Sequence, residues 1–545
     1  MFYKSAMVAT LMIFSLIDGA LAQDTPPAAL AAPATPRFTI QRFAVEGASL
    51  IDARQIEASL APFTGPLRDF ADVQHALETM EALYKERGYN TVYISVPEQE
   101  LDQGVVQLKV VEGRIRQIRV EGNQHYTAEN IRASLPALQI GEAPFAGRLS
   151  ENIQLANENP TKEIQVTLGI GDEEGEINAK VKVKDESPWR LSTSLDNTGT
   201  ESTGKLRIGA SIQHNNIADT DQSFSLSYTS SPDKPEGVGV DVYSLGYRIP
   251  LYRLGDSIDL LYAKSSVGVP AASPSLAGAL GIVGKGDIIS LRYNWLLPRE
   301  GEYTSRFVFA LDDRAMESSC TTASGARLTG VSGCEPYAVR PLSVTYNGRW
   351  QGIERSSSFN LGIATNVGAS SAESYDLASG NRRAPTRFTI FRAGGSIAQE
   401  FSNGMQLRLS GQAQYADRPL VPTEQMGLAG SNAVRGFNER AVASDQGWLL
   451  QTELYSPELS GLLSIPGSLR ALGFYDIAGG RTLGTVSGNS RSGVASAGVG
   501  LRYSHAKNIS WRFDLANILQ SHAASADSAL IDNRWRGHFA FAYSF

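Results

Sequence analysis

The chain has 545 residues, a formal net charge of −7 and a hydrophobic fraction of 42%. A negative net charge gives no indication of nucleic-acid binding. The six histidines lack the spacing of a metal site or a catalytic triad. No apolar run of about 18 residues occurs beyond residue 22, which excludes a protein that spans a membrane with helices.

The first 22 residues are typical of a secretory signal peptide. Lys4 supplies a positive charge, residues 6–17 are mostly apolar, and Ala20–Ala22 form a small-residue cleavage site. The alternative, a membrane anchor, requires a longer apolar segment. Residues 23–37 contain four prolines and are expected to form a short, extended linker.

Residues 38–113 have the pattern of a soluble α+β domain, with a strand, two helices and two further strands in that order. The same order recurs in residues 114–187. The segment Phe43–Gly47 is echoed by Ile118–Gly122, which strengthens the correspondence. We therefore expect two tandem modules.

Alternation of apolar and polar residues dominates from residue 188 to the end. Trp511 and Phe513, for example, alternate with Arg512 and Asp514. Ions on the polar face would not suit a dry core, but they suit a hydrated lumen with lipid on the other face. About 16 such strands can be placed in residues 188–545, which predicts a transmembrane β-barrel.

The chain ends on the same alternating pattern. Phe541, Tyr543 and Phe545 alternate with small or polar residues, and the last residue is itself aromatic. We expect this final strand to face lipid with its rings, and we interpret the three aromatic residues as a barrel-assembly signal.

The connections between the expected strands alternate between short and long. Three short connections, expected to face the periplasm, are 215–221, 249–256 and 298–302. Four longer ones, expected to face outward, are 267–285, 314–336, 367–385 and 417–446. One of the long connections contains Cys320 and Cys334, the only two cysteines. In an exported chain they are expected to form a disulfide, and no nearby histidine supports a metal site.

The longest connection, residues 417–446, carries Val434, Arg435, Gly436 and Phe437. Two large apolar residues and an arginine around a glycine are unusual at the tip of a solvent-exposed loop. We therefore expect this loop to fold back into the lumen. On a later strand, Phe474 and Asp476 share the face that should be luminal. We predict that Arg435 forms a planar ion pair with Asp476. The alternative is an exposed arginine with a weak surface pair.

Residues 199–205 spell most of a phosphate-binding loop. Position 206 is Leu instead of Ser or Thr, and the flanking segments are strands. We interpret these residues as a hairpin connection, and we expect neither a cofactor nor an enzymatic activity.

These motifs resemble those of the two-partner secretion transporter family, the TpsB proteins, which is part of the BamA-type superfamily. The family's loop motif matches Val434–Phe437, and its strand motif Phe-x-Asp-x-Gly matches Phe474 and Asp476, with the glycine displaced to Gly479. The segment Leu195–Gly199 also looks like the family. The resemblance implies two periplasmic POTRA domains, 38–113 and 114–187, followed by an outer-membrane barrel of 16 antiparallel strands, 188–545.

The resemblance implies a transporter that recognises an unfolded exoprotein in the periplasm through its POTRA domains and passes it through the barrel to the cell surface. The expected exoprotein is TpsA-like and carries an N-terminal secretion domain. Further expected partners are outer-membrane lipid and the barrel assembly machinery, with no nucleic acid, and the transporter is expected to be a monomer. Many members carry a pore-plugging helix before the first module; residues 23–37 are too short for one, so we expect none or a vestige. Two alternatives remain: a factor that inserts other barrels, and a passive porin or receptor.

Overall fold

The computed structural model describes residues 36–100, 102–201, 203–234, 239–266, 285–317, 320–321, 327–328, 335–485, 488–506, 508–522 and 534–545. The predicted signal peptide lies outside these residues, as does nearly all of the linker. So does Cys334, and the predicted disulfide therefore remains a prediction. None of the helices in the described part of the chain is both long and apolar enough to cross a membrane.

The first module builds a three-stranded sheet in the order β2-β5-β4 and a separate pair, β1 with β3. Alternation predicts one strand over residues 38–45, but it is broken at Gln41, because β1 pairs with β3 whereas β2 pairs in parallel with β5. Helices α1 and α2 bury apolar side chains that include Ile56, Leu60 and Met80. The elements are β1 (Phe38–Ile40), β2 (Arg42–Glu46), α1 (Ala53–Leu60), η1 (Ala61–Phe63), β3 (Gly65–Arg68), α2 (Phe70–Glu86), β4 (Val92–Ser95), η2 (Asp102–Gly104) and β5 (Val105–Glu112).

The second module repeats the plan with a sheet in the order β6-β8-β7. Its elements are β6 (Arg114–Glu121), α3 (Ala128–Ala133), α4 (Ala146–Ala156), β7 (Lys162–Ile170) and β8 (Glu176–Asp185). The Thr127 hydroxyl begins α3 by accepting a bond from the Asn130 N–H at 3.1 Å. Ile131 and Leu149 of the helices pack against Ile164 and Val181 of the sheet. This confirms the predicted second α+β module.

The sequence similarity between Phe43–Gly47 and Ile118–Gly122 ends in each case on a glycine, and that glycine has a steric reason. Gly47 and Gly122 follow corresponding strands, and both have positive φ angles, 85° and 92°. A Cβ atom at Gly47 would lie 2.2 Å from the carbonyl oxygen of Val110, and one at Gly122 would lie 2.4 Å from that of Val183. Both modules therefore use a glycine where the first strand of the sheet meets the backbone of the last.

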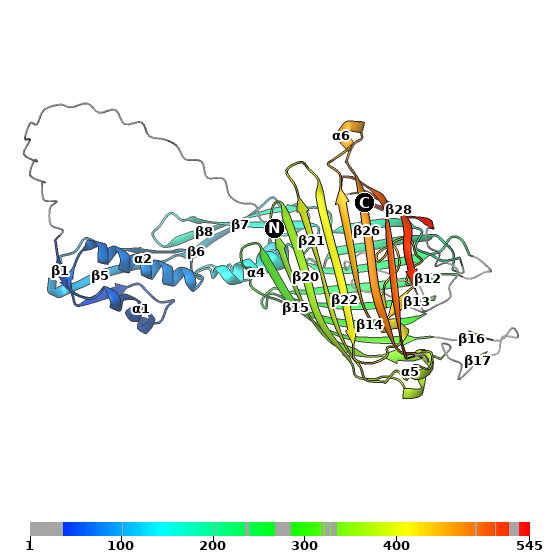
Figure 1. Ribbon diagram of the computed structural model, residues 1–545. Coiled ribbons are helices and arrows are strands. Elements are labelled where there is room, and N and C mark those ends of the chain that lie inside the picture. Colours follow the sequence, from blue (N-terminus) through cyan, green and yellow to red (C-terminus); the bar gives the residue numbers. More distant parts are fainter. Residues whose placement is uncertain are drawn as a thin grey trace, which may run out of the picture. The chain divides into compact units, whose positions relative to one another are not determined.

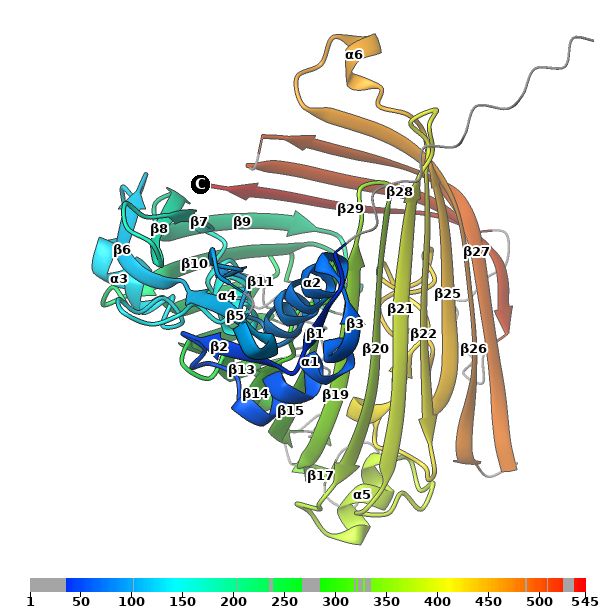
Figure 2. The same ribbon diagram turned by 90° about the vertical axis from the view of Figure 1, so that its left-hand side faces the viewer.

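Within the described residues, sixteen antiparallel strands close into a barrel, as the sequence predicts (Figure 1). β18 and β19 are two pieces of one strand, separated by Arg340, and both pair with β15. The first and last strands, β9 and β29, pair with each other and complete the barrel (Figure 2). The strands are β9 (Trp189–Asp196), β10 (Arg207–Ile217), β11 (Gln222–Ser230), β12 (Asp241–Leu251), β13 (Asp256–Ser265), β14 (Gly286–Leu296), β15 (Tyr303–Met316), β18 (Tyr337–Val339), β19 (Pro341–Gln351), β20 (Arg355–Asn366), β21 (Thr389–Glu400), β22 (Gln406–Ala416), β25 (Gln446–Tyr455), β26 (Ser468–Thr485), β27 (Gly488–His505), β28 (Ile509–His522) and β29 (Trp535–Ser544).

The two faces of the barrel strands differ as the alternation predicts. On β28, Trp511 and Phe513 are 58% and 45% exposed. Asp514, the next residue along the strand, points to the other face and is fully buried. Other large apolar side chains are exposed in the same way, including Tyr228 and Trp448. The outward face is therefore a band of apolar and aromatic side chains, and the inward face carries ions and hydrogen-bonding groups.

The connections at the two ends of the barrel differ in length. The short turns at 218–221 and 252–255 mark one end, here called the module end, because residues of the second module contact them. The opposite end, here called the loop end, carries the longer connections. One of these contains α5 (Ala372–Ala378), and another contains the small hairpin of β16 (Cys320–Thr321) and β17 (Arg327–Leu328). At the module end one connection is longer than expected and contains α6 (Ser460–Leu463); Figure 1 shows α5 and α6 at opposite ends.

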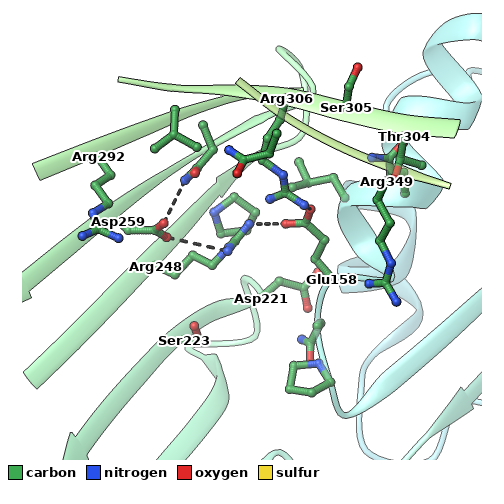
Figure 3. A pocket seen from close by; sticks show the side chains of 18 of the residues that line it. Glu158, Asp221, Ser223, Arg248, Asp259, Arg292, Thr304, Ser305, Arg306 and Arg349 are labelled. Carbon is green, nitrogen blue, oxygen red and sulfur yellow. Dashed lines mark hydrogen bonds and ion pairs between the residues drawn. The ribbon is translucent and has the colours of Figure 1, made fainter. Parts of the chain in front are cut away.

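The second module is fastened to the barrel by buried polar contacts. Lys162 of β7 forms a fully buried ion pair with Asp221, and the Asn130 amide donates to Asp221 Oδ1 at 3.1 Å. Burial lowers the pKa of Lys162, and the Asp221 carboxylate opposes this effect. Beside this pair, Glu158 forms ion pairs with Arg248 and Arg306 (Figure 3). The module and the barrel strands thus share one electrostatic network.

The end of the chain completes the seam of the barrel. The N–H of Phe545 donates to the carbonyl of Leu191 on β9 at 2.8 Å, and the Phe545 ring lies edge-to-face with Tyr543, with 4.5 Å between the ring centroids. The Phe545 side chain is 64% exposed on the outward side. The terminal residue therefore contributes both a seam hydrogen bond and an outward ring.

We expect deletion of Phe545 to lower the amount of membrane-inserted protein, because it removes the seam bond and the terminal ring together. Outer-membrane fractions analysed for the compact, heat-modifiable form on gels measure this amount. Phe545→Tyr is the matched control, since it retains both features and should insert normally. Equal insertion of the deleted and full-length chains would count against the assembly signal.

Candidate functional site

The connection between β22 and β25, residues 417–446, folds back on itself and is called the inward loop. Its stem contains η5 (Pro422–Glu424) and the short pair β23 (Met426–Gly427) and β24 (Ala443–Ser444). Backbone bonds extend this order toward the tip: the N–H of Leu428 donates to the carbonyl of Val442 at 2.8 Å. The loop is therefore a structured hairpin rather than an irregular surface segment.

The tip of the inward loop packs against the barrel wall. Val434 and Phe437 are fully buried, and they join one apolar cluster with wall residues from four neighbouring strands. These wall residues are Leu449 of β25, Ala478 of β26, Val494 of β27 and Ile518 of β28. Burying a side chain of this size contributes roughly 1.5–3 kcal/mol, so the apolar flanks of Arg435 hold the tip inside the barrel.

Arg435 and Asp476 form the pair that the sequence predicts. Arg435 Nε lies 2.6 Å from Asp476 Oδ2, and Nη2 lies 2.7 Å from Oδ1, so the pair is bidentate. Both side chains are fully buried. The guanidinium carbon also lies 3.6 Å from the centre of the Phe474 ring, which adds a cation–π contact.

The pair is part of a larger charge cluster that sequence reasoning missed. Arg435 Nη1 lies 2.8 Å from Glu453 Oε1 and 3.4 Å from Asp514 Oδ1. Arg502 Nη2 lies 2.8 Å from Asp514, and Arg512 Nε lies 2.8 Å from its other oxygen. Three arginines thus face three carboxylates, and the cluster is formally neutral.

Arg512 also binds the loop directly. Its Nη2 donates to the carbonyl of Ser431 at 2.6 Å, and its Nη1 donates to Asn432 Oδ1 at 3.0 Å. Glu439 turns back within the loop and accepts a bond from the Ser431 N–H at 2.6 Å. The charged wall therefore holds the loop backbone as well as the Arg435 side chain.

Gly436 is required by its position against the wall. Its φ angle is 97°, and a Cβ atom there would lie 3.2 Å from Ile518 and 3.4 Å from Ala516. The N–H of Gly436 donates to His538 Nε2 of β29 at 2.9 Å, so this nitrogen carries no proton. The tip motif is thereby bound at four successive residues, 434–437.

Gly479, the displaced glycine of the strand motif, lies within β26, which continues unbroken from Ser468 to Thr485. A Cβ atom at Gly479 would lie 3.0 Å from the Trp448 ring on the neighbouring strand. Ala478 is buried in the cluster beneath the loop. The displacement therefore causes no turn at this point, and the Asp476 carboxylate keeps its inward direction.

Comparison with known proteins shows to which family a chain of this architecture belongs. A model of the family described as "Haemolysin secretion/activation protein ShlB/FhaC/HecB" matches residues 175–503. The chain belongs to this family. A second model, described as "POTRA domain, ShlB-type", matches residues 38–113.

Similar proteins come from several bacteria. The heme/hemopexin transporter protein HuxB of Haemophilus influenzae (strain 86-028NP) is 22% identical over 482 residues, covering 86% of this chain and 81% of HuxB. The hemolysin transporter protein ShlB of Serratia marcescens is 23% identical over 530 residues, covering 94% and 88%. The solved structure of CdiB from Escherichia coli has a TM-score of 0.74 at 20% identity and covers 95% of this chain and 92% of CdiB, a likeness of fold.

Members of this family are outer-membrane transporters of two-partner secretion. The chain is accordingly an outer-membrane protein with its POTRA domains in the periplasm. The module end of the barrel therefore faces the periplasm, and the loop end faces the cell exterior. Among the described residues, no group of His, Cys, Asp and Glu is arranged to hold a metal ion.

A second set of charges holds the root of the inward loop at the loop end. Asp445, fully buried, accepts a bond from Arg382 Nη1 at 2.6 Å and another from the Leu420 N–H at 3.1 Å. Glu424, also buried, lies 2.6 Å from Arg314 Nη1. These carboxylates flank the tip motif in the sequence, but nothing in the sequence points to their arginine partners, which lie on a distant strand and in another loop.

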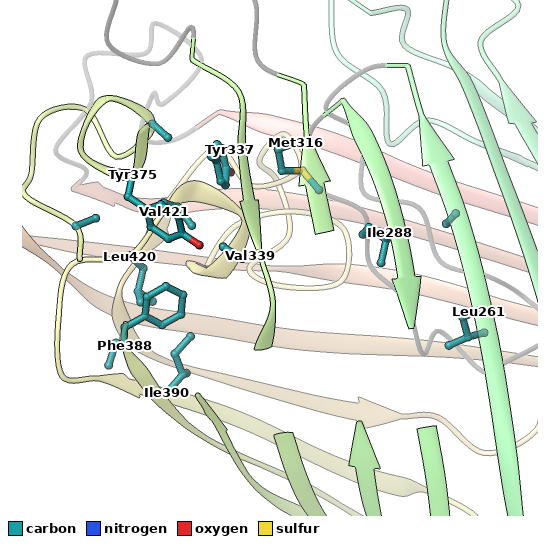
Figure 4. Close-up of a cluster of buried hydrophobic side chains, with 14 of the residues drawn as sticks. Leu261, Ile288, Met316, Tyr337, Val339, Tyr375, Phe388, Ile390, Leu420 and Val421 are labelled. Carbon is teal, nitrogen blue, oxygen red and sulfur yellow. The ribbon is translucent and has the colours of Figure 1, made fainter. Parts of the chain in front are cut away.

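An apolar cluster surrounds the same root (Figure 4). Leu420 and Val421 of the inward loop pack with Tyr375 of α5, Phe388 and Ile390. Further members come from the inner face of β12 to β18; these are Val242, Leu261, Ala263, Ile288, Met316, Tyr337 and Val339. The loop is thus held by ions and by apolar packing at both its tip and its root.

We expect Asp476→Asn and Arg435→Ala to loosen the tip while the barrel stays folded. Removing one partner of a buried pair typically costs about 3–5 kcal/mol, and Glu453 and Asp514 reduce that loss for Asp476→Asn by retaining part of the attraction to Arg435. Proteinase K cleavage within residues 417–446 of the purified protein measures the release, and gel mobility without heating reports the intact barrel.

Asp313→Asn is the matched control, because Asp313 forms an exposed pair with Arg340 at 3.2 Å on another strand. It should leave cleavage of the inward loop unchanged. Equal cleavage of Asp476→Asn, Arg435→Ala and the unsubstituted protein would show that the charge cluster does not hold the tip.

Proposed function

We propose that the protein exports one unfolded partner polypeptide across the outer membrane, recognising it with the POTRA domains and conducting it through the barrel. The partner is a secreted exoprotein of the TpsA type, and the transporter acts as a monomer. The ion-held tip of the inward loop is the observation on which the proposal rests, because a charge cluster can be opened and re-formed without unfolding the wall.

The barrel is wide enough for this task once the loop has moved. Barrels of about 16–18 strands are wide enough to leave an aqueous channel, whereas the interior of an eight-stranded barrel is only wide enough for side chains or one small ligand. The luminal groups beside the loop are ionic or hydrogen-bonding, as with Arg502 and Gln451. An unfolded chain in such a lumen exchanges water for polar contacts that are weak one by one, so it can keep moving.

The POTRA sheets offer edges to which an extended substrate segment can add a strand. In the described residues, β2 and β4 are the edges of the first sheet, and β6 and β7 are those of the second. Backbone bonding at such an edge does not depend on side chains, which suits the capture of an unfolded chain before it enters the barrel.

Two other functions fit a barrel preceded by soluble modules: insertion of other barrels into the membrane, and passive permeation. Deletion of the gene separates them. We expect deletion to retain one large exoprotein in the periplasm and to leave other outer-membrane proteins at normal levels. Depletion of many outer-membrane proteins would instead indicate an insertion factor.

We further expect Arg435→Ala and Asp476→Asn to restore export poorly in the deletion strain, because the tip must be held and released in a defined way. Quantification of the exoprotein in the medium, at matched amounts of transporter in the outer membrane, measures this. Asp313→Asn should restore export fully. Normal export by both cluster variants would contradict a role of the tip in transport.

A further inference from the structure

The periplasmic mouth of the barrel contains a basic cavity of about 840 Å³. Five arginines line it, each on an inward position of a different strand: Arg190, Arg248, Arg292, Arg306 and Arg349. Among the described residues, three carboxylates line it with them, Glu158, Asp221 and Asp259, and Asp221 is already paired with Lys162. Figure 3 labels four of these five arginines, Arg248, Arg292, Arg306 and Arg349, together with Glu158 and Asp259.

One part of the cavity is occupied by the chain itself. Residues 157–161, which follow α4 and precede β7, form an irregular segment of the second POTRA domain. The Glu158 carboxylate of this segment pairs with Arg248 and lies 2.7 Å from Arg306 Nη2. Two residues later, the carbonyl of Pro160 accepts a bond from Arg190 Nη2 at 2.7 Å. The arginines of the mouth thus bind both a carboxylate and a backbone carbonyl of one irregular segment.

These contacts are the ones that an unfolded acidic polypeptide would offer. Its carboxylates can pair with planar guanidinium groups, and its carbonyls are free of secondary structure. Arg349 is exposed, and in the described part of the chain it has no ion-pair partner. The cavity can therefore bind a further carboxylate through Arg349, in addition to the groups of residues 157–161.

We propose that the arginines at the mouth bind acidic stretches of the exported polypeptide, and that Glu158 occupies one carboxylate position until the substrate displaces it. This inference rests on the proposed export function and adds the chemistry of its entry site. Glu158 then acts as an internal competitor: it keeps Arg248 and Arg306 in place at rest and is exchanged for a substrate carboxylate when a chain arrives.

The test uses the full-length protein in a non-ionic detergent at low salt. The probe is a fluorescein-labelled peptide of alternating glutamate and glycine, and its binding is followed by fluorescence anisotropy. We expect Glu158→Gln to bind the peptide about fivefold more tightly, because the competing carboxylate is removed. Arg306→Gln should bind about fivefold more weakly, and combining it with Glu158→Gln should cancel most of the gain.

Matched controls come from the second POTRA domain. Glu163→Gln and Arg132→Gln alter exposed residues outside the cavity and should leave affinity unchanged. A peptide of alternating glutamine and glycine should not bind. Unchanged affinity in Glu158→Gln together with a lower unfolding temperature would overturn the proposal, because the carboxylate would then only fasten the domain. Equal weakening by Arg132→Gln and Arg306→Gln would overturn it too.

Failure of this inference can be told apart from failure of the proposed function. The peptide assay reports the cavity alone, whereas the deletion strain reports export. A strain that retains an exoprotein in the periplasm, combined with cavity variants that bind the peptide like the controls, would leave export standing and remove the entry site. Normal secretion in the deletion strain would remove export itself.

Discussion

The buried guanidinium of Arg435 fixes the tip of the inward loop against one part of the barrel wall. A charge removed from water needs several compensating groups, and no single strand can supply them. Asp476, Glu453 and Asp514 come from three different strands, so the cluster forms only when the wall has its full register and the loop is inside. The position of the loop tip therefore depends on the register of the wall, whereas the wall itself is held by the backbone pairing of its strands.

The tip and the root of the loop each combine ions with apolar packing. At the tip, a neutral set of three arginines and three carboxylates surrounds one glycine-containing turn. At the root, Asp445 and Glu424 act together with an apolar cluster that includes Tyr375 and Phe388. Ionic contacts respond to competing ions and to added charge, whereas apolar packing does not. The ionic contacts at the tip can therefore be weakened without disturbing the apolar cluster at the root.

Much of this could be predicted from the sequence because its signals are local. A period of two residues predicts strands with two unlike faces, and the motif at 434–437 predicts a loop tip that turns inward. Asp476 could be identified because its own strand shows which face is luminal. Glu453 and Asp514 could not, because any inward carboxylate on sixteen strands gives the same pattern until the register is known. The break at Gln41 was missed for a related reason, since the partners of β1 and β2 lie far along the chain.

The even number of strands has a consequence for the ends of the chain. The polypeptide enters the barrel at β9 from the side of the POTRA domains, and after sixteen crossings its last residue returns to that side. A tag fused after Phe545 would be hidden from antibodies added to intact cells, whereas an epitope inserted between β20 and β21 would be displayed to them. A position after Phe545 is thus unsuited to surface labelling, and the connection that carries α5 is the better place for a reporter.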